Sequence, residues 1–198
     1  MLNLIAQAEI EGGRFKQGAD VEILLTPKDG QPIALTGKID PLTRGTLVRT
    51  PAGDSKGPWT AVVRMRSDDN LADSDTVSIE RSSGTLLGKP IAYRTASAAA
   101  SAYRPLAAFQ FRRTERVRIE WPALQAIESH QARLLDRTGK PIAIPLTTAM
   151  RDNGGTPMLA TDLNLAPFSN GDYLIEVSAK AGEKTETQVV AIRVSMAR

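Results

Sequence analysis

The sequence predicts an all-β protein built from two tandem β-sandwich domains, and three observations lead to that prediction. Short runs in which apolar and polar residues alternate recur along the chain, as expected of strands with one buried face. Gly, Pro and Asn separate these runs, and no stretch has the period of a long amphipathic helix. The 198 residues also suffice for two separate cores, because domains of about 100 residues are common.

Residues 1–80 are expected to form the N-terminal sandwich. The predicted strands are 2–10, 20–26, 31–39, 45–50, 59–65 and 75–79. Pro27–Gly30, between the second and third strands, combines proline, aspartate and glycine, which suit a tight hairpin turn. Many short strands joined by such turns are typical of a sandwich rather than of an α/β sheet.

Residues 81–108 are expected to be the interdomain connection. Ser82–Gly84 and Lys89–Pro90 are chain breakers, and a short strand at 91–93 fits after them. Ala96–Ala102 is a low-complexity run of small residues that is too short for a stable isolated helix.

Residues 109–198 are expected to form the C-terminal, fibronectin-like sandwich, which opens on the clearest strand in the chain. Within Phe109–Pro122, the apolar residues Val117, Ile119 and Trp121 fall on one face, and charged residues occupy the other. The proline at its end has no amide hydrogen to donate, so the strand is expected to stop there. Further strands are predicted at 131–136, 141–148, 158–165, 171–178 and 187–194.

The two halves repeat one another. Leu24–Ala34 parallels Leu134–Ala143, with one residue more in the first turn. Gly57–Trp59 leads into an apolar strand, as does Gly171–Tyr173, and a β-branched strand follows in both halves. Two matches in the same order predict tandem sandwiches of common design.

Leu165–Tyr173 has the pattern of a tyrosine corner. In such a corner a tyrosine just inside a strand hydrogen-bonds back to the preceding connection between the sheets. Tyr173 stands at that place, which favours immunoglobulin/fibronectin-like sandwiches.

Composition excludes several classes of protein. The chain has no cysteine, so it has neither disulfides nor thiolate metal sites. No apolar run reaches the roughly 20 residues that a membrane-spanning helix needs. The net charge is +3 with both signs mixed, which lacks the dense basic stripe of a general nucleic-acid binder. The N-terminus has no signal-peptide pattern and starts as a strand, which suggests a segment of something longer.

Catalytic residues are not evident, and we expect neither an enzyme nor a cofactor. His130 is the only histidine, and the neighbouring Ser129 would point away from it on an extended chain. We interpret His130 as an exposed loop residue ahead of a strand. A triad would also require an orienting acid and an oxyanion hole, which the sequence does not reveal.

Four acidic residues crowd the segment Ser67–Ser74 and the strand after it. Calcium binds several oxygen ligands from a tight turn, so these residues are candidate metal ligands. The competing interpretation is a solvated acidic loop between two strands, because the spacing of an EF-hand is missing. The candidates are Asp68, Asp69, Asp73 and Asp75.

A basic stretch around the opening strand of the second half is a candidate site for an anion or an acidic partner. On alternating positions, Arg112, Arg116 and Arg118 would share one face and attract negative charge. The competing interpretation is the wet face of a strand, whose charges discourage unwanted strand pairing. The candidates are Arg104, Arg112, Arg113, Arg116 and Arg118.

Several ordered blocks in residues 80–198 resemble the C-terminal region of the acidobacterial von Willebrand factor A-related proteins. These blocks are Leu87–Arg94, Tyr103–Pro105, Phe111–Pro122, Ala132–Pro145, Ala160–Pro167 and Gly171–Glu176. The resemblance implies an accessory β-sandwich tail of an exported, extracytoplasmic protein. The chain has no Asp-x-Ser-x-Ser motif and no A domain, so the metal-dependent adhesion of that domain is not implied.

Together these features predict a noncatalytic structural or interaction module. A protein partner or a surface polymer is the expected kind of ligand. The alternative is a carbohydrate- or polyanion-binding sandwich, which exposed aromatic side chains would favour. Trp59, Trp121, Tyr93, Tyr103 and Tyr173 are expected mostly in cores or corners.

Overall fold

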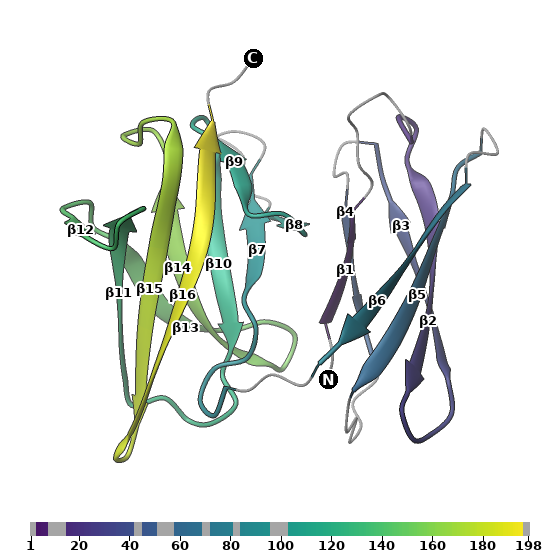
Figure 1. Ribbon diagram of the computed structural model, residues 1–198, viewed down its shortest axis with the longest axis horizontal. Helices are drawn as coiled ribbons and strands as arrows, with labels where there is room; N and C mark the ends of the chain where they lie inside the picture. The colour runs from purple at the N-terminus through teal and green to yellow at the C-terminus, as the bar shows by residue number, and fades with distance from the viewer. Residues whose placement is uncertain are drawn as a thin grey trace. The chain divides into compact units, whose positions relative to one another are not determined.

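The computed structural model describes residues 3–7, 15–41, 45–50, 58–68, 72–80, 84–95 and 103–195, with backbone alone for 3–7. The described residues are all-β and contain no helix, which confirms the predicted class. The chain divides into two compact units, drawn in Figure 1. The first unit contains residues 1–81 and 104–107, and the second contains residues 82–103 and 108–198.

The first unit contains a sheet with the strand order β3-β2-β5-β6 and a separate antiparallel pair, β1-β4. A short strand, β8, is grouped with this unit. The strands are β1 (Asn3–Gln7), β2 (Ala19–Pro27), β3 (Ile33–Ile39), β4 (Gly45–Arg49), β5 (Trp59–Arg66), β6 (Ala72–Ile79) and β8 (Arg104–Leu106).

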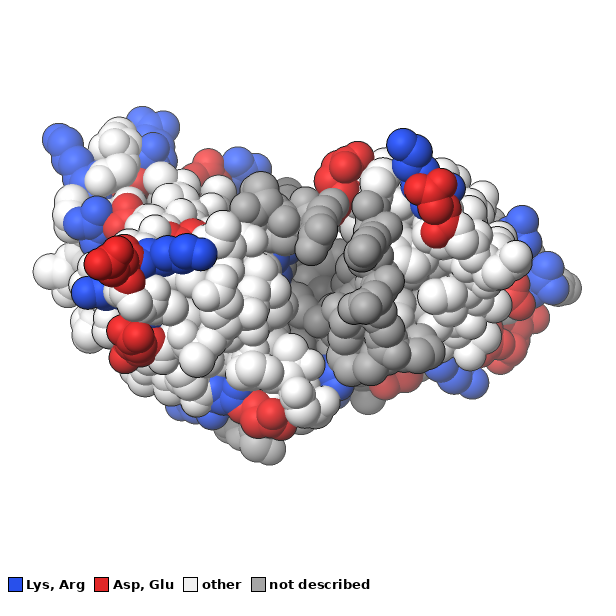
Figure 2. Space-filling view, turned by 90° about the horizontal axis from the view of Figure 1, so that it is seen from below, with Lys and Arg blue, Asp and Glu red and all other residues white. Residues whose placement is uncertain are grey.

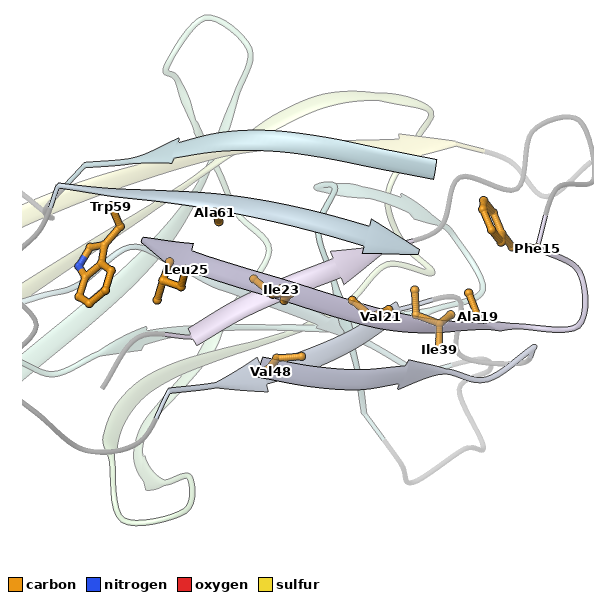
Figure 3. Close-up of a cluster of buried hydrophobic side chains, with 9 residues drawn as sticks. All are labelled: Phe15, Ala19, Val21, Ile23, Leu25, Ile39, Val48, Trp59 and Ala61. Atoms are coloured by element: carbon orange, nitrogen blue, oxygen red, sulfur yellow. The ribbon is translucent and has the colours of Figure 1, made fainter. Parts of the chain in front are cut away.

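The core of the first unit follows from the alternation in β2. Val21, Ile23 and Leu25 are buried, whereas the residues between them face outward. Figure 3 shows these side chains along β2, with Trp59 at one end of the cluster and Phe15 at the other. The alternation of apolar and polar residues in β2 therefore suffices to predict which of its side chains form this core.

The second unit consists of two sheets that pack as a sandwich, seen as two layers in Figure 1. One sheet contains β13, β14, β10 and β7 in that order, and the other has the order β12-β11-β15-β16-β9. The strands are β7 (Ile91–Arg94), β9 (Gln110–Arg112), β10 (Arg116–Pro122), β11 (Ser129–Asp136), β12 (Pro141–Ile142), β13 (Thr147–Asp152), β14 (Pro157–Asn164), β15 (Gly171–Ala181) and β16 (Lys184–Ser195).

The inward faces of β10 and β15 supply much of the second core. Val117, Ile119 and Trp121 are fully buried on β10, as the alternation predicts, and Ile175 and Val177 are fully buried on β15. The neighbouring strand pairs are antiparallel apart from β16 and β9, which are parallel at Arg193–Ser195.

The predicted corner at Tyr173 is present. The Tyr173 hydroxyl donates a hydrogen bond to the Ser169 carbonyl oxygen at 2.9 Å. The ring of Phe168 meets that of Tyr173 edge-on, with centroids 4.9 Å apart and planes at 74°. This contact fixes the chain as it enters β15.

The predicted strand Phe109–Pro122 ends at Pro122 as expected, but it is two strands rather than one, because the chain changes sheets in its middle. β9 lies beside β16, a turn follows at Arg113–Thr114, and β10 then lies between β7 and β14 in the other sheet. The predicted strand 141–148 divides in the same way, into β12 in one sheet and β13 in the other. Alternation shows which residues are extended, but it does not show a change of sheet.

The predicted connection at 81–108 is also divided differently. Residues 82–103 belong to the second unit, where β7 pairs with β10 from Ile91↔Glu120 to Arg94↔Val117. Leu86 and Leu87 are fully buried there. Leu86, Leu87 and β7 therefore belong to the core of the second unit, although the segment also contains residues that usually interrupt strands.

One strand order recurs in the two units, and the predicted alignment of their hairpins needs a correction. The order β3-β2-β5-β6 matches β12-β11-β15-β16. Leu25 pairs with Ile33 and Leu134 pairs with Ile142, so the two hairpins have equal length and the predicted extra residue disappears. Leu134 matches the buried Leu25 rather than Leu24, which is 43% exposed on the opposite face.

Candidate functional site

The structure separates the arginines of the basic stretch. Arg112 lies on β9, whereas Arg116 and Arg118 lie on β10 in the other sheet. The prediction that these three share one face is therefore wrong. Its physical cause is the corner between the two strands, which breaks the alternation on which the prediction rested.

Glu115 holds this corner. The Arg112 amide donates to its Oε2 at 2.9 Å, and Arg94 Nη1 lies 3.3 Å from its Oε1. Glu115 is buried, and burying a carboxylate is tolerated when such donors surround it. The Arg116 amide donates to Thr95 Oγ1 at 3.3 Å, which starts β10 on the far side of the corner.

On the outer face of β10, Arg118 is the centre of a polar cluster. It lies opposite Asp162 of β14, with Nε 2.7 Å from Oδ1 and Nη2 3.3 Å from Oδ2. Arg151 Nη2 donates to the same Oδ2 at 3.0 Å. The Arg118 guanidinium also lies over the Tyr103 ring, 4.1 Å from its centroid, and the Tyr103 hydroxyl donates to Asp162 at 3.4 Å. We call Tyr103, Arg118, Arg151 and Asp162 the Tyr103 cluster.

Electrostatics within the Tyr103 cluster follow from burial and from Asp162. Burial, reinforced by the charge of Asp162, raises the pKa of Tyr103 above its ordinary value. Burial opposes the charged form of Arg118, but the hydrogen bond and the charge of Asp162 outweigh it, so the pKa of Arg118 is raised. Burial and Asp162 together favour the protonated form of Tyr103, and Asp162 favours the charged form of Arg118.

A second polar group lies on the same face of β10. Glu120 is buried, and Asn153 Nδ2 donates to its Oε2 at 2.9 Å. The same amide nitrogen lies 3.3 Å from the Tyr93 hydroxyl oxygen. Asn153 belongs to the β13–β14 turn, so this turn is bound to β10 and β7.

The pairing within the Tyr103 cluster limits the chemistry that its side chains can perform. Asp162 already accepts hydrogen bonds from three side chains, which makes it a poor general base. Arg118 is engaged in a bidentate pair and cannot offer the same two donors to an anion. The partly exposed Tyr103 ring and the exposed Arg116 remain as surface for a polar ligand.

The remaining candidate arginines are dispersed. Arg112 is exposed on β9, and Arg113 Nη2 donates to the Ala166 carbonyl oxygen at 2.7 Å. Arg104 lies in β8, which is grouped with the first unit. Figure 2 shows basic and acidic side chains interspersed on the described part of one face.

Of the four acidic candidates, Asp73 lies in a strand rather than in the predicted loop. Asp73 and Asp75 lie in β6, Asp68 is exposed after β5, and Asp69 lies outside the described residues. Asp73 Oδ1 accepts the Ser74 amide at 2.9 Å, and Asp75 Oδ1 accepts the Thr76 amide at 2.7 Å. Among the residues that the structure describes, no three His, Asp or Glu side chains gather as a metal site would require.

His130 lies within β11 rather than in a loop before it. Its Nδ1 is 3.2 Å from Thr148 Oγ1. Ser129 and His130 face Lys180 and Ala179, respectively, on β15, and they alternate in direction as expected of an extended chain.

Sequence reasoning missed Asp162, Arg151, Glu120 and Asn153 as members of polar clusters. Asp162 is a charged residue in an apolar strand, which is a visible signal. Its partnership with Arg118 depends on the register of β10 and β14, however, and the sequence does not state that register.

In comparisons with known proteins, no family model and no curated protein matches the chain. In the described part of the chain, there is no helix of the length and apolarity needed to cross a membrane.

Proposed function

We propose that the protein is a noncatalytic interaction module made of two immunoglobulin-like β-sandwiches. The carrying observation is the strand order of the second unit. We label β7, β10, β11, β13, β14, β15 and β16 as strands A to G and leave out β8, β9 and β12. The sheets then have the orders A-B-E-D and C-F-G. That arrangement is the one expected of an immunoglobulin-like sandwich.

Two further observations support the proposal. The hydrogen bond from the Tyr173 hydroxyl to Ser169 lies at the start of β15, which corresponds to strand F. Immunoglobulin-like sandwiches have their tyrosine corner at this place. The matching order β3-β2-β5-β6 supports a first unit of the same design, in which these strands correspond to those of the second unit.

The noncatalytic assignment is supported by how the polar side chains are used. Asp162, Glu115 and Glu186 each accept two or more hydrogen bonds from neighbouring parts of the second unit. Groups held in this way stabilise the fold and are not poised to exchange protons with a substrate.

The resemblance of residues 80–198 to the tail region of the von Willebrand factor A-related proteins extends the proposal. By that resemblance the module is the accessory tail of a larger exported protein and works outside the cytoplasm. A protein partner or a surface polymer is the proposed ligand.

A carbohydrate- or polyanion-binding role is the second candidate. The observation that favours it is the Tyr103 ring, which lies beside Arg118 and is only partly buried. Aromatic faces next to charged and hydrogen-bonding groups suit sugars and sulfated polymers.

One experiment tests both proposals. The ¹⁵N-labelled chain is titrated with heparin and with a neutral oligosaccharide, and its hydrolysis of chromogenic ester, phosphate and glycoside substrates is measured. The interaction module predicts no turnover, and sustained turnover by the purified chain would overturn it. Heparin shifts around Tyr103 that Arg116→Glu removes and Arg112→Glu leaves intact would favour the polyanion role, because Arg112 lies on the other sheet.

A further inference from the structure

Asn-Gly dipeptides occur twice in the chain, at Asn153–Gly154 and Asn170–Gly171, and both lie in the second unit. The other asparagines of the chain each precede leucine. Asparagine before glycine is prone to intramolecular attack, because glycine has no side chain to hinder its amide nitrogen. The two dipeptides have the same intrinsic chemistry, so the fold decides which of them reacts.

The side chain of Asn153 is held by its neighbours. Its Nδ2 donates to Glu120 Oε2 at 2.9 Å and lies 3.3 Å from the Tyr93 hydroxyl oxygen. The Asn153 backbone amide donates to the Thr156 carbonyl oxygen at 3.0 Å, which closes the turn between β13 and β14. Glu120 is buried, and a hydrogen bond to a buried carboxylate is costly to break. Rotation of the Asn153 side chain is therefore restricted.

Asn170 lies in the bend that precedes β15, and its side chain is exposed. In the described part of the chain, no group forms a hydrogen bond with this side chain. A Cβ added at Gly171 would meet no atom within 4 Å, so water and hydroxide can reach this peptide group. Gly171 pairs with Val194 as the first pair of β15, and pairs at the end of a strand open more readily than those in its middle. The fold thus restrains Asn170 less than Asn153.

We propose that Asn170–Gly171 is a site of spontaneous modification, at which the asparagine converts into aspartate and isoaspartate. Hydroxide removes the proton of the Gly171 amide, and the nitrogen attacks Asn170 Cγ. The new bond from nitrogen to Cγ replaces the bond from Cγ to Nδ2, which takes up a proton from water and leaves as ammonia. Water then opens the succinimide, at Cγ to give aspartate or at the main-chain carbonyl to give isoaspartate. This inference goes beyond the proposed interaction role and does not rest on it.

The two products differ in their effect on the tyrosine corner. Aspartate leaves the path of the backbone unchanged and adds a negative charge. Isoaspartate carries the chain through the side-chain carbon and lengthens the backbone by a methylene group. The lengthened link lies between Ser169 and Tyr173, whose hydrogen bond of 2.9 Å closes the corner. Isoaspartate is therefore expected to weaken the entry into β15, whereas aspartate is not.

The test is peptide mapping by mass spectrometry of the full chain after incubation for days in mildly alkaline buffer. Exchange of the amide NH₂ for OH changes the mass of a peptide, and chromatography separates its aspartyl and isoaspartyl forms. Conversion at Asn170 is expected to be about tenfold faster or more than at Asn153, whose side chain must break hydrogen bonds to react. Equal rates in the folded protein, or faster conversion at Asn153, would overturn the proposal.

Incubation in guanidinium chloride is the matched control, because it removes the contacts of both asparagines and leaves their sequences unchanged. The two sites are expected to convert at similar rates there. An unchanged difference in denaturant would show that the sequence rather than the fold sets it. Conversion of Asn170 in denaturant alone would show that the fold protects both sites. Either result would overturn the proposal.

Two variants test the consequence for the corner. Asn170→Gln cannot form the five-membered succinimide and is expected to resist conversion, whereas freshly prepared Asn170→Asp is expected to unfold as unmodified wild type does. Incubated wild type is expected to contain a fraction that unfolds at lower denaturant, in proportion to its isoaspartate. The incubated Gln variant should lack this fraction. Unaltered unfolding of protein shown to contain isoaspartate at this position would overturn the predicted effect on the corner.

Discussion

Single residues decide where the second unit is most sensitive to substitution, and Trp121 is the largest fully buried one. We expect Trp121→Ala to lower the free energy of unfolding of this unit by about 3–5 kcal/mol, because a large cavity replaces the ring. Trp121→Phe is the matched variant. Nε1 of Trp121 has no hydrogen-bond partner in the described structure, so its loss removes no bond. Denaturant unfolding measures both, and an alanine cost below 1 kcal/mol would contradict the buried position.

Asp162 contributes, after burial, to the raised pKa of Tyr103. Burial and the nearby Asp162 carboxylate both raise the pKa of Tyr103, so Asp162→Asn is expected to move that pKa down toward its ordinary value. Ultraviolet absorbance during alkaline titration measures the shift, and Tyr103→Phe identifies which of the three tyrosines is responsible. An upward shift in the Asn variant would show that the Asp162 carboxylate does not raise the pKa of Tyr103.

Glu186 gives the contact between residues 84–88 and β16 a pH dependence. Burial opposes its charged form, but the amides of Leu86 and Thr85 and the side chain of Gln188 outweigh burial and lower its pKa. A carboxyl group with a lowered folded pKa stabilises the fold above its unfolded pKa, and this contribution is lost as pH falls through the folded value. Glu186→Gln is therefore expected to destabilise the second unit near neutral pH by about 1 kcal/mol.

The difference between wild type and Glu186→Gln is expected to vanish in acid, where the carboxyl group is protonated in both states. Urea unfolding at several pH values measures it. Glu183→Gln, at the exposed β15–β16 turn, is the control and should show no such dependence. A difference that grows as pH falls would have the wrong sign and would contradict the role of Glu186.

At the scale of elements, hairpins and faces could be predicted from the sequence, but the positions where the chain changes sheets could not. Val117, Ile119 and Trp121 alternate with charged residues, so their common buried face was visible. Thr114 and Glu115 carry no breaker signal, and their corner depends on Glu115 binding Arg94 from another strand. The Tyr103 cluster was hidden for the same reason, since Arg118 meets Asp162 only through register.

The hairpin between β11 and β12 provides a test at this scale. Gly139 has a φ of 85°, and a Cβ added there would meet no atom within 4 Å. Gly139→Ala is expected to destabilise the second unit by about 1 kcal/mol through backbone strain alone. Gly139→Asn should cost less, because asparagine tolerates a left-handed conformation. Thermal unfolding compares them, and an alanine variant as stable as wild type would contradict the turn.

At the scale of the whole molecule, the chain forms two compact β units, and the core of each contains one of the two tryptophans. Trp59 is in the first core, and Trp121 is in the second. The Trp121→Phe variant therefore keeps only Trp59, whose fluorescence reports on the first unit. The Trp59→Phe variant keeps only Trp121, whose fluorescence reports on the second unit. The net charge is only +3, because basic and acidic residues are nearly equal in number. We therefore expect no large electrostatic repulsion within the chain.

The most direct test of this organisation is denaturant unfolding of the two single-tryptophan proteins, each with and without Ile23→Ala. Ile23 is buried in the first core, and its truncation is expected to lower that unit's free energy of unfolding by about 2–5 kcal/mol. The Trp59 transition is expected to move to lower denaturant while the Trp121 transition stays in place. A common shift of both transitions would show one cooperative core and would contradict the division into two units.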